Sequence, residues 1–161
     1  ALMLGSHPHV RFVLMGSGMR RQILIDAAKE KGLSNVEFIE PQPKKDVANF
    51  IYASDICLAV LKNTDVFKTV YPNKIFDYMV CKKPIVVAID GAARDLVERA
   101  DAGVFVQPEA PSLLKNAIIA LSEDSALRER MGANGYAYVT KHFSREALAK
   151  SYLDILSSLA S

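Results

Sequence analysis

Short apolar runs rich in β-branched residues alternate along the chain with longer segments whose apolar residues recur at helical spacing. The runs predict five strands, at Val10–Met15, Val36–Ile39, Ile56–Val60, Ile85–Ile89 and Gly103–Val106. The intervening segments predict four helices, at Arg20–Lys31, Asp46–Ala53, Lys74–Val80 and Ala92–Ala100. Three further helices are predicted after the last strand, at Ser112–Leu121, Ala126–Tyr138 and Arg145–Leu159.

The order of these elements indicates the fold class. Strands that alternate with helices pair in parallel, because parallel neighbours need a long crossover connection that a helix supplies. Ile56–Val60 and Ile85–Ile89 are apolar on both faces, as expected for strands that are covered by helices on each side. We therefore expect an α/β fold with a Rossmann-like, doubly wound parallel sheet of about five strands and a helical C-terminal tail. The length of 161 residues, without repeats or linkers, predicts a single domain over residues 1–161.

Composition and charge exclude several classes of function. The formal net charge is +2, and no basic stretch is interleaved with aromatic residues, so we expect no nucleic-acid partner. No apolar run approaches the roughly 20 residues that span a bilayer, so no transmembrane segment is expected. The two cysteines, Cys57 and Cys81, have no metal-like or redox-like spacing, which suits two free thiols in the cytoplasm. Cys57 lies within a predicted buried strand and is interpreted as a core residue.

The first residues of the chain are apolar but do not form a signal-peptide core. The run Ala1–Leu4 stops at Gly5, and it has neither an initiator methionine nor a helix-capping residue before it. It is interpreted as the tail of a helix whose beginning is missing. The chain is therefore expected to be a fragment of a longer protein.

Ligands of doubly wound sheets bind at the carboxyl ends of the strands, where the amino ends of helices also point. Two connections at this edge contain candidate binding residues. Gly16-Ser17-Gly18 follows the first strand, and the connection from Leu61 to Asn73 follows the third. Loops of about 12 residues are uncommon in compact domains and are usually functional. The second connection is therefore the more informative of the two.

Gly16-Ser17-Gly18 has two interpretations. Its glycines allow the backbone to pass close to a bulky anion, and its amides can face phosphate. A tight turn from strand to helix without a ligand explains the same residues equally well. As a dinucleotide signature the segment is incomplete, since Arg21 occupies the third glycine position. Glu40, at the end of the second strand, can still accept a hydrogen bond from a ribose, so dinucleotide binding remains an alternative.

The segment Tyr71–Met79 contains a cation and a carboxylate at helical spacing. Pro72 sets a turn, Asn73 can cap the helix that follows, and Lys74 and Asp77 share one face of that helix. A lysine can neutralise phosphate, and an aspartate can accept hydrogen bonds from two ribose hydroxyls. The alternative is a surface ion pair between residues i and i+3, which contributes only a few tenths of a kcal/mol.

A family resemblance favours the nucleotide-binding interpretation. The chain resembles the C-terminal domain of retaining glycosyltransferases with the GT-B fold. The residues that carry the resemblance are Val10–Gly18, Val36–Ile39, Tyr52–Ile56, Pro72–Val87, Gly91, Gly103–Pro108, Leu127–Gly135 and Phe143-Ser144. They follow the family's order and cover nearly the whole chain. Within them, the stretch from Leu61 to Met79 is most similar to bacterial surface-polysaccharide enzymes that transfer amino-deoxy sugars.

The resemblance implies roles for single residues. In the family, two glutamates separated by seven residues contact the sugar and the donor ribose. Asp77 falls on the second position as a shorter carboxylate, whereas the first position holds Thr69, so sugar contact by a carboxylate is not expected there. The resemblance instead implies contacts from the backbone of Thr69, Val70 and Tyr71, and a phosphate contact from Lys74. Asn73, Gly16, Ser17 and Gly18 complete the expected donor-nucleotide site.

The resemblance also implies an activity for the parent protein. It would transfer a sugar, of the hexosyl or N-acetylhexosaminyl type, from a nucleotide sugar, expected to be UDP-linked, to a saccharide or lipid-linked acceptor. The implied reaction retains anomeric configuration and needs no metal or cofactor, and its catalytic residues belong to an N-terminal acceptor domain outside this chain. We expect a cytoplasmic protein that can associate with the inner-membrane surface, and an isolated chain without turnover. A non-catalytic or dinucleotide-binding Rossmann-like domain is the alternative.

The last predicted helix has an apolar face that needs a partner. Leu148, Tyr152, Ile155 and Leu159 recur at helical spacing on it. The resemblance implies that this helix crosses back to the N-terminal domain. Left uncovered, such a face can drive self-association.

Overall fold

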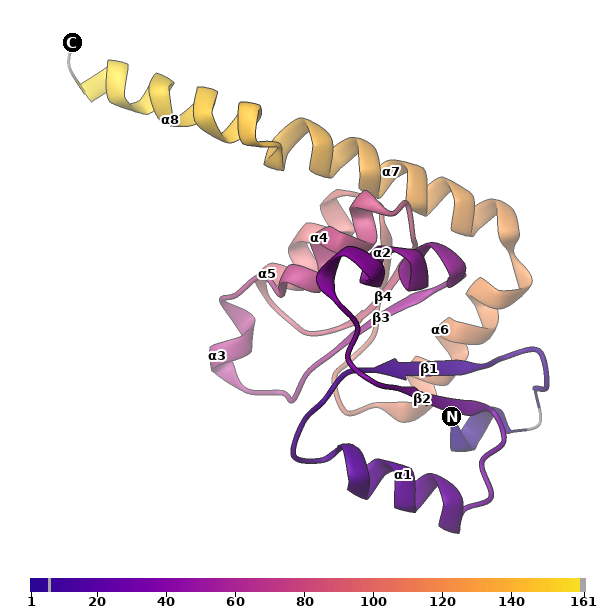
Figure 1. The fold of residues 1–161 in the computed structure, drawn as a ribbon. Helices are drawn as coiled ribbons and strands as arrows, with labels where there is room; N and C mark the ends of the chain where they lie inside the picture. Colours follow the sequence, from indigo (N-terminus) through magenta and orange to yellow (C-terminus); the bar gives the residue numbers. More distant parts are fainter. Residues whose placement is uncertain (6, 160–161) are drawn as a thin grey trace. The chain divides into compact units, whose positions relative to one another are not determined.

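The computed structural model describes residues 1–5 and 7–159. The chain separates into two compact units, residues 1–50 and 51–161, and helix α2 (Lys44–Ala53) begins in the first and ends in the second. The ribbon in Figure 1 shows strands and helices alternating up to β5 and helices alone thereafter. The predicted α/β fold class with parallel strands and a helical C-terminal region is confirmed.

Residues 1–50 contain a two-stranded parallel sheet. Strand β1 (Phe12–Met15) pairs with β2 (Val36–Ile39) in a register that places Phe12 opposite Val36, and helix α1 (Arg21–Glu30) connects the two strands. None of the residues of β1, β2 or α1 is buried. Residues Leu2–Leu4 form one 3-10 turn.

Residues 51–161 contain a three-stranded parallel sheet and most of the helices. Its strands are β3 (Cys57–Val60), β4 (Ile85–Ala88) and β5 (Gly103–Phe105), with β4 in the centre. The helices are α3 (Asp65–Lys68), α4 (Asn73–Val80), α5 (Ala92–Arg99), α6 (Pro111–Glu123), α7 (Ser125–Phe143) and α8 (Arg145–Leu159).

The buried core of residues 51–161 lies on the two faces of β4. Ile85 and Val87 belong to a cluster with residues of α4 and α5, whereas Val86 and Ala88 belong to a second cluster with Leu121 of α6. Successive side chains of a strand point to opposite faces, so one strand contributes to both clusters. All four residues of β4 are buried, as the continuous apolar run predicts for a strand covered on both sides.

Helix α7 packs closely on the end of α4 because two of its residues are glycines. A Cβ at Gly132 would overlap the carbonyl oxygen of Lys82 and lie 2.7 Å from its carbonyl carbon. A Cβ at Gly135 would lie 3.0 Å from Cβ of Ala102 and 3.2 Å from Cγ of Met79. These glycines bring the long helix against the core beside β4.

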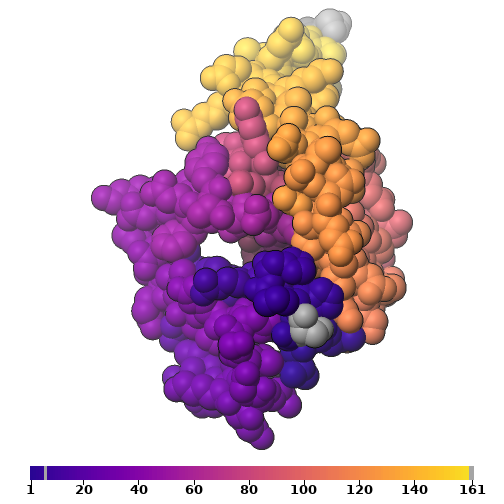
Figure 2. Space-filling model, turned by 90° about the vertical axis from the view of Figure 1, so that its right-hand side faces the viewer, coloured from indigo at the N-terminus to yellow at the C-terminus, as the bar shows by residue number. Residues whose placement is uncertain are grey.

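Helix α8 continues beyond α7 after a break at Ser144, whose Oγ accepts a hydrogen bond from the amide of Ala147 at 3.1 Å. It projects away from the other helices of its unit, as Figures 1 and 2 show. None of its described residues is buried, and Leu148 and Ile155 are more than half exposed. Packing of this face on a partner remains a prediction.

No helix of the described chain is both long enough and apolar enough to cross a membrane.

The sheet differs from the predicted one in its pairing. All five predicted strands form, but β1 and β2 pair only with each other, and β3, β4 and β5 form a separate sheet. Apolar runs predict where strands form, whereas the choice of neighbour depends on backbone hydrogen bonds that the side-chain pattern does not encode. Helix α3 was not predicted, because its four residues are too few to show a helical period.

Candidate functional site

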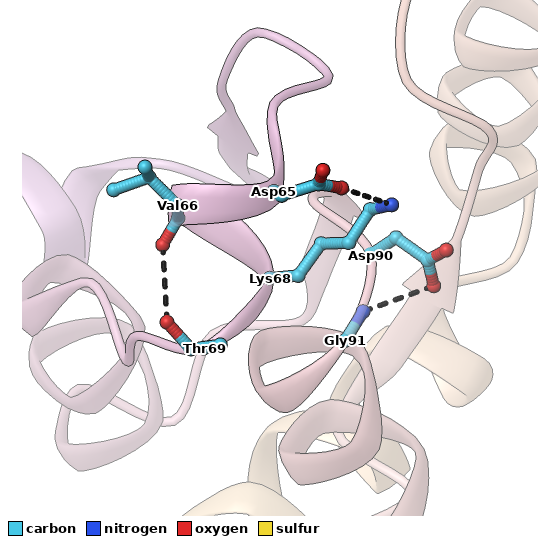
Figure 3. A network of polar contacts seen from close by, with 6 residues as sticks. All are labelled: Asp65, Val66, Lys68, Thr69, Asp90 and Gly91. Carbon is cyan, nitrogen blue, oxygen red and sulfur yellow. Dashed lines mark hydrogen bonds and ion pairs between the residues drawn. The ribbon is translucent and has the colours of Figure 1, made fainter.

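The connection between β3 and α4 presents its polar groups to solvent at the carboxyl edge of the three-stranded sheet. It contains the short helix α3, and the side chain of Phe67 packs against the core. Within the connection, Nζ of Lys68 lies 2.8 Å from Oδ1 of Asp65, and Oγ1 of Thr69 donates to the carbonyl oxygen of Val66 at 3.2 Å. Figure 3 shows both contacts beside the turn that follows β4. The Asp65–Lys68 and Thr69–Val66 contacts therefore hold the shape of the connection from within.

The ion pair in this connection shifts the pKa of both partners. The hydrogen bond to Lys68 lowers the pKa of Asp65. The same hydrogen bond raises the pKa of Lys68, and the charge of nearby Asp90 raises it further. Both side chains are exposed and stay charged at neutral pH, so the pair is screened by salt.

The start of α4 has no side-chain cap. Pro72 occupies the position before the helix with φ −63° and ψ 126°, and no side chain accepts from the first helical amides. The prediction that Asn73 caps the helix is wrong, because Asn73 is already its first residue and cannot take the extended backbone of a cap. The amino end of α4 is left with exposed N–H groups, which favour an anion.

Three backbone amides near this helix start, those of Tyr71, Asn73 and Lys74, have no hydrogen-bond acceptor within the described residues, and all three residues are exposed. The amides of Thr69 and Val70 instead close the last turn of α3. Exposed amides in succession, leading into a helix amino end, can surround an anionic oxygen. The ring of Tyr71 lies 6.0 Å from that of Phe76 and 6.4 Å from that of Phe143, which ties the end of the connection to α4 and α7.

Lys74 and Asp77 are both exposed on α4, and no ion pair joins them in the described structure. The alternative interpretation of these residues as a surface ion pair is therefore wrong. Their spacing places both on one face of the helix, but each side chain keeps its hydrogen-bonding capacity for solvent or a ligand. A free ammonium and a free carboxylate thus stand within one helical turn of the unpartnered amides.

The turn after β4 was not among the predicted site residues, although it lies at the same edge. Oδ1 of Asp90 accepts a hydrogen bond from the amide of Gly91 at 3.0 Å and lies 3.5 Å from Nη1 of Arg94. The Arg94 guanidinium stacks over the ring of Phe105 at 4.2 Å and donates from Nε to Glu98 at 3.0 Å. In the sequence, an aspartate and a glycine directly after a fully buried strand are the signal for this turn.

In residues 1–50, Gly16, Ser17 and Gly18 line an open hollow of about 230 Å³. Arg20 and Arg21 also line it, together with apolar residues of β1, α1 and β2. Gly16 has φ +136°, a conformation that side chains disfavour, so the turn itself requires a glycine there. The hollow can accept an anion at its glycine turn, and its two arginines supply positive charge.

Glu40 is not free to bind a ribose as the dinucleotide alternative requires. Its Oε1 lies 2.8 Å from Nη2 of Arg21, whose side chain is only 23 % exposed. Arg21 therefore stands at the third glycine position of the dinucleotide signature. It also pairs with one oxygen of the Glu40 carboxylate that would bind the ribose. This pair argues against a dinucleotide site in residues 1–50.

The described part of the chain meets the requirements of neither a metal site nor a reactive thiol. It contains no group of three or more His, Cys, Asp or Glu side chains placed to hold a metal ion. Cys57 is buried, and burial raises the pKa of its thiol to about 12. The interpretation of Cys57 as a core residue rather than a nucleophile is confirmed.

A parallel α/β fold whose strand ends carry a segment suited to an anion is an architecture on which many nucleotide-binding domains are built. Residues 2–138 match the family model of the glycosyl transferases group 1, and the chain belongs to this family. A comparison with curated protein sequences finds no match.

Solved structures with the same fold include several glycosyltransferases. Sucrose-phosphate synthase from Thermosynechococcus elongatus is 22 % identical with a TM-score of 0.79, and the alignment covers 98 % of this chain and 41 % of that one. The Anabaena protein HepE in complex with UDP-glucose is 25 % identical with a TM-score of 0.77, covering 94 % and 42 %. The C-terminal domain of LpcC, a group 1 protein from Francisella tularensis, is 21 % identical with a TM-score of 0.70, covering 90 % and 76 %. The chain thus spans less than half the length of the first two.

Proposed function

We propose that this chain, residues 1–161, is the donor-binding domain of a retaining GT-B glycosyltransferase and that it binds a UDP-sugar. The observation that carries the proposal is the set of exposed, unpartnered amides of Tyr71, Asn73 and Lys74, next to the free side chains of Lys74 and Asp77. Membership of the glycosyl transferases group 1 and the likeness to HepE in complex with UDP-glucose support a UDP-sugar as the ligand.

Each residue has a distinct task in this proposal. Lys74 and the amide of Tyr71 bind the diphosphate, and Asp77 accepts hydrogen bonds from the two ribose hydroxyls. Asn73 adds its first-turn amide to the same anion site. When the sugar leaves, negative charge grows on the diphosphate, and the amides and Lys74 already point at the place where it grows. Charge stabilisation by these groups needs no metal or cofactor.

Thr69 stands where the family resemblance places a carboxylate. Its hydroxyl donates to the carbonyl oxygen of Val66, so the side chain is turned back into the connection. We infer that the side chain at this position does not bind the sugar. Gly16, Ser17 and Gly18 are proposed as a phosphate-binding segment in their own right, because their glycine turn allows close approach of an anion.

We further propose that the parent protein transfers an amino-deoxy sugar, hexosyl or N-acetylhexosaminyl, in bacterial surface-polysaccharide synthesis, such as that of lipopolysaccharide or capsule. The acceptor is a saccharide or a lipid-linked saccharide, bound by an N-terminal domain of the same protein that also supplies the catalytic residues. The parent works in the cytoplasm, at the inner-membrane surface. The basis for these finer assignments is the resemblance of the stretch from Leu61 to Met79.

The test is a calorimetric titration of the chain with UDP, with GDP and NADH as comparators. Lys74→Ala and Asp77→Ala should each weaken UDP binding about tenfold or more, because each removes a charge-assisted hydrogen bond worth ~1.5–3 kcal/mol. Lys150→Ala and Asp154→Ala are matched controls, since both residues are exposed on α8, and they should leave binding unchanged. If neither Lys74→Ala nor Asp77→Ala weakens UDP binding, the proposed site is wrong. If the chain binds NADH more tightly than UDP, the dinucleotide alternative replaces the proposal.

A further inference from the structure

The turn after β4 touches the backbone of the donor-binding connection at a place where only a glycine fits. Gly91 has φ +80° and ψ −136°, a backbone conformation essentially limited to glycine. A Cβ at this position would overlap the carbonyl oxygen of Lys68 and lie 2.8 Å from its carbonyl carbon and 2.9 Å from its Cα. The backbone of Lys68 therefore rests directly on Gly91, three residues before the first free amide, that of Tyr71.

The supporting side of this contact is firmly held. β4 is buried along its whole length and leads into the turn, where the Asp90 carboxylate accepts from the Gly91 amide at 3.0 Å. Arg94 holds the same carboxylate at 3.5 Å while its guanidinium stacks on Phe105. Gly91 is thus fixed by the sheet and by α5, independently of the connection that rests on it.

The supported side has few other anchors. The ion pair of Asp65 with Lys68 and the bond from Thr69 to Val66 join residues within the connection, so they shape it without fixing its place. Between its ends, its other ties to the unit are the partly buried ring of Phe67 and a bond of 3.5 Å from the Asn63 amide to Glu109. At its ends, Leu61 packs against the core and the ring of Tyr71 lies near those of Phe76 and Phe143. Figure 3 shows the Asp90-Gly91 turn directly beside Lys68.

We propose that Gly91 is a positioning residue for the donor site: its missing side chain lets the Lys68 backbone settle on the β4–α5 turn, which sets where the amides of Tyr71, Asn73 and Lys74 face the nucleotide sugar. This inference rests on the proposed function for the identity of the ligand. The backbone contact itself does not depend on it.

Gly91→Ala is the direct test, read by hydrogen exchange of residues 64–74 and by UDP titration of the same protein. We expect exchange of residues 64–74 to rise at least tenfold at their hydrogen-bonded amides, such as those of Thr64 and Phe67, because the other amides already exchange freely. UDP binding should weaken at least tenfold, with exchange of β4 unchanged. Gly32→Ala is the matched control, because Gly32 also has a positive φ of +59° but has nothing within 4 Å of its Cβ position. It should change neither readout.

A milder variant covers the case in which Gly91→Ala fails to fold. Asp90→Ala removes the acceptor of the Gly91 amide without adding an atom near Lys68, and it should raise exchange of residues 64–74 and weaken UDP binding about threefold. Asp90→Asn keeps an oxygen acceptor and should restore most of both. Unchanged exchange of residues 64–74 in Gly91→Ala, or in Asp90→Ala where only that variant folds, would overturn the inference.

The two readouts separate this inference from the proposed function. If the unaltered chain fails to bind UDP while Gly91→Ala still raises exchange of residues 64–74, the positioning contact stands and the donor assignment falls. If the unaltered chain binds UDP and Gly91→Ala binds it equally well, the donor assignment stands and Gly91 has no positioning role.

Discussion

The two compact units of the chain bury their apolar residues to very different degrees. In residues 51–161, every residue of β4 is buried, and hydrophobic clusters cover both of its faces. In residues 1–50, Val13 of β1 is 50 % exposed and Leu14 is 38 % exposed, and α1 has no buried residue. One unit has a core of its own, whereas the other has a two-stranded sheet, which is marginal by itself in water.

This difference gives the two candidate binding segments, one in each unit, unequal support. The connection that leads to Lys74 and Asp77 stands on a packed core and on the Gly91 turn. The Gly16–Gly18 turn stands on β1 and β2, which are held mainly by their mutual backbone bonds. We therefore expect the stability of the chain, and the fixed geometry of its site, to come mostly from residues 51–161.

The largest expected effect comes from truncating the core of β4. Ile85→Ala should lower the free energy of unfolding by ~2–5 kcal/mol, because Ile85 is fully buried and the surrounding helices cannot collapse onto the cavity. Leu14→Ala, in partly exposed β1, should cost about 1 kcal/mol or less. Urea unfolding followed by circular dichroism compares the two, and equal losses would contradict the contrast between the units.

Alkaline pH should act on residues 51–161 through Cys57, which is buried, and Tyr78, which is half-buried. Burial raises the pKa of Cys57 from 9.0 to about 12 and that of Tyr78 from 10.0 to about 12. The folded state therefore holds protons that the unfolded state releases, so the stabilisation is complete below pH 9 and is lost as pH rises toward 12. For Cys57 the loss by pH 11 is roughly 3 kcal/mol.

Cys57→Ala provides the check on this pH dependence, since it removes the titrating thiol. The slope of unfolding free energy between pH 9 and 11, measured in urea, should be shallower in this variant than in the unaltered chain. Residues 1–50 contain no cysteine or tyrosine, so they have no counterpart to this effect. An identical slope in both proteins would show that the Cys57 thiol is accessible in the folded state.

The smallest expected effect is at the glycine turn of residues 1–50. Gly16→Ala should lower stability by about 1 kcal/mol through its φ of +136° alone, because nothing lies within 4 Å of the added Cβ. Gly18→Ala has the same open surroundings without a positive φ, and it should change stability by less than ~0.5 kcal/mol. Thermal unfolding of the two variants measures the difference. A large loss of stability in Gly18→Ala would contradict the open surroundings of this turn.

The helices and strands were predictable because burial on one or both faces makes apolar residues recur at a regular spacing in the sequence. The continuous apolar run from Ile85 predicted a strand covered on both faces, and β4 is buried throughout. The pairing of β1 with β2 alone was not predictable, since backbone bonds leave no side-chain pattern. Helix α7 runs on to Phe143, beyond the predicted Tyr138, because its last turn packs aromatic rings rather than a regular apolar stripe.

The candidate site was predictable in part, from chemistry rather than period. A lysine and an aspartate at helical spacing after Pro72 indicated the start of α4, and both side chains are free there. The supporting contact of Gly91 with Lys68 was beyond sequence reasoning, because it joins two backbones across the sheet edge. A glycine in a sequence shows that a side chain is absent, but it does not show which neighbouring atom packs into the space that a Cβ would fill.

A contact between two backbones leaves the side chains around it open to change. Val66, Thr69 and Val70 are exposed, and none of them supplies the atoms that rest on Gly91. Exchanging these side chains alters what the connection offers a ligand while the path of its main chain stays the same. Substitutions on this loop can therefore change what it offers a ligand, by design or over generations, while the turn beneath keeps the loop on the same course.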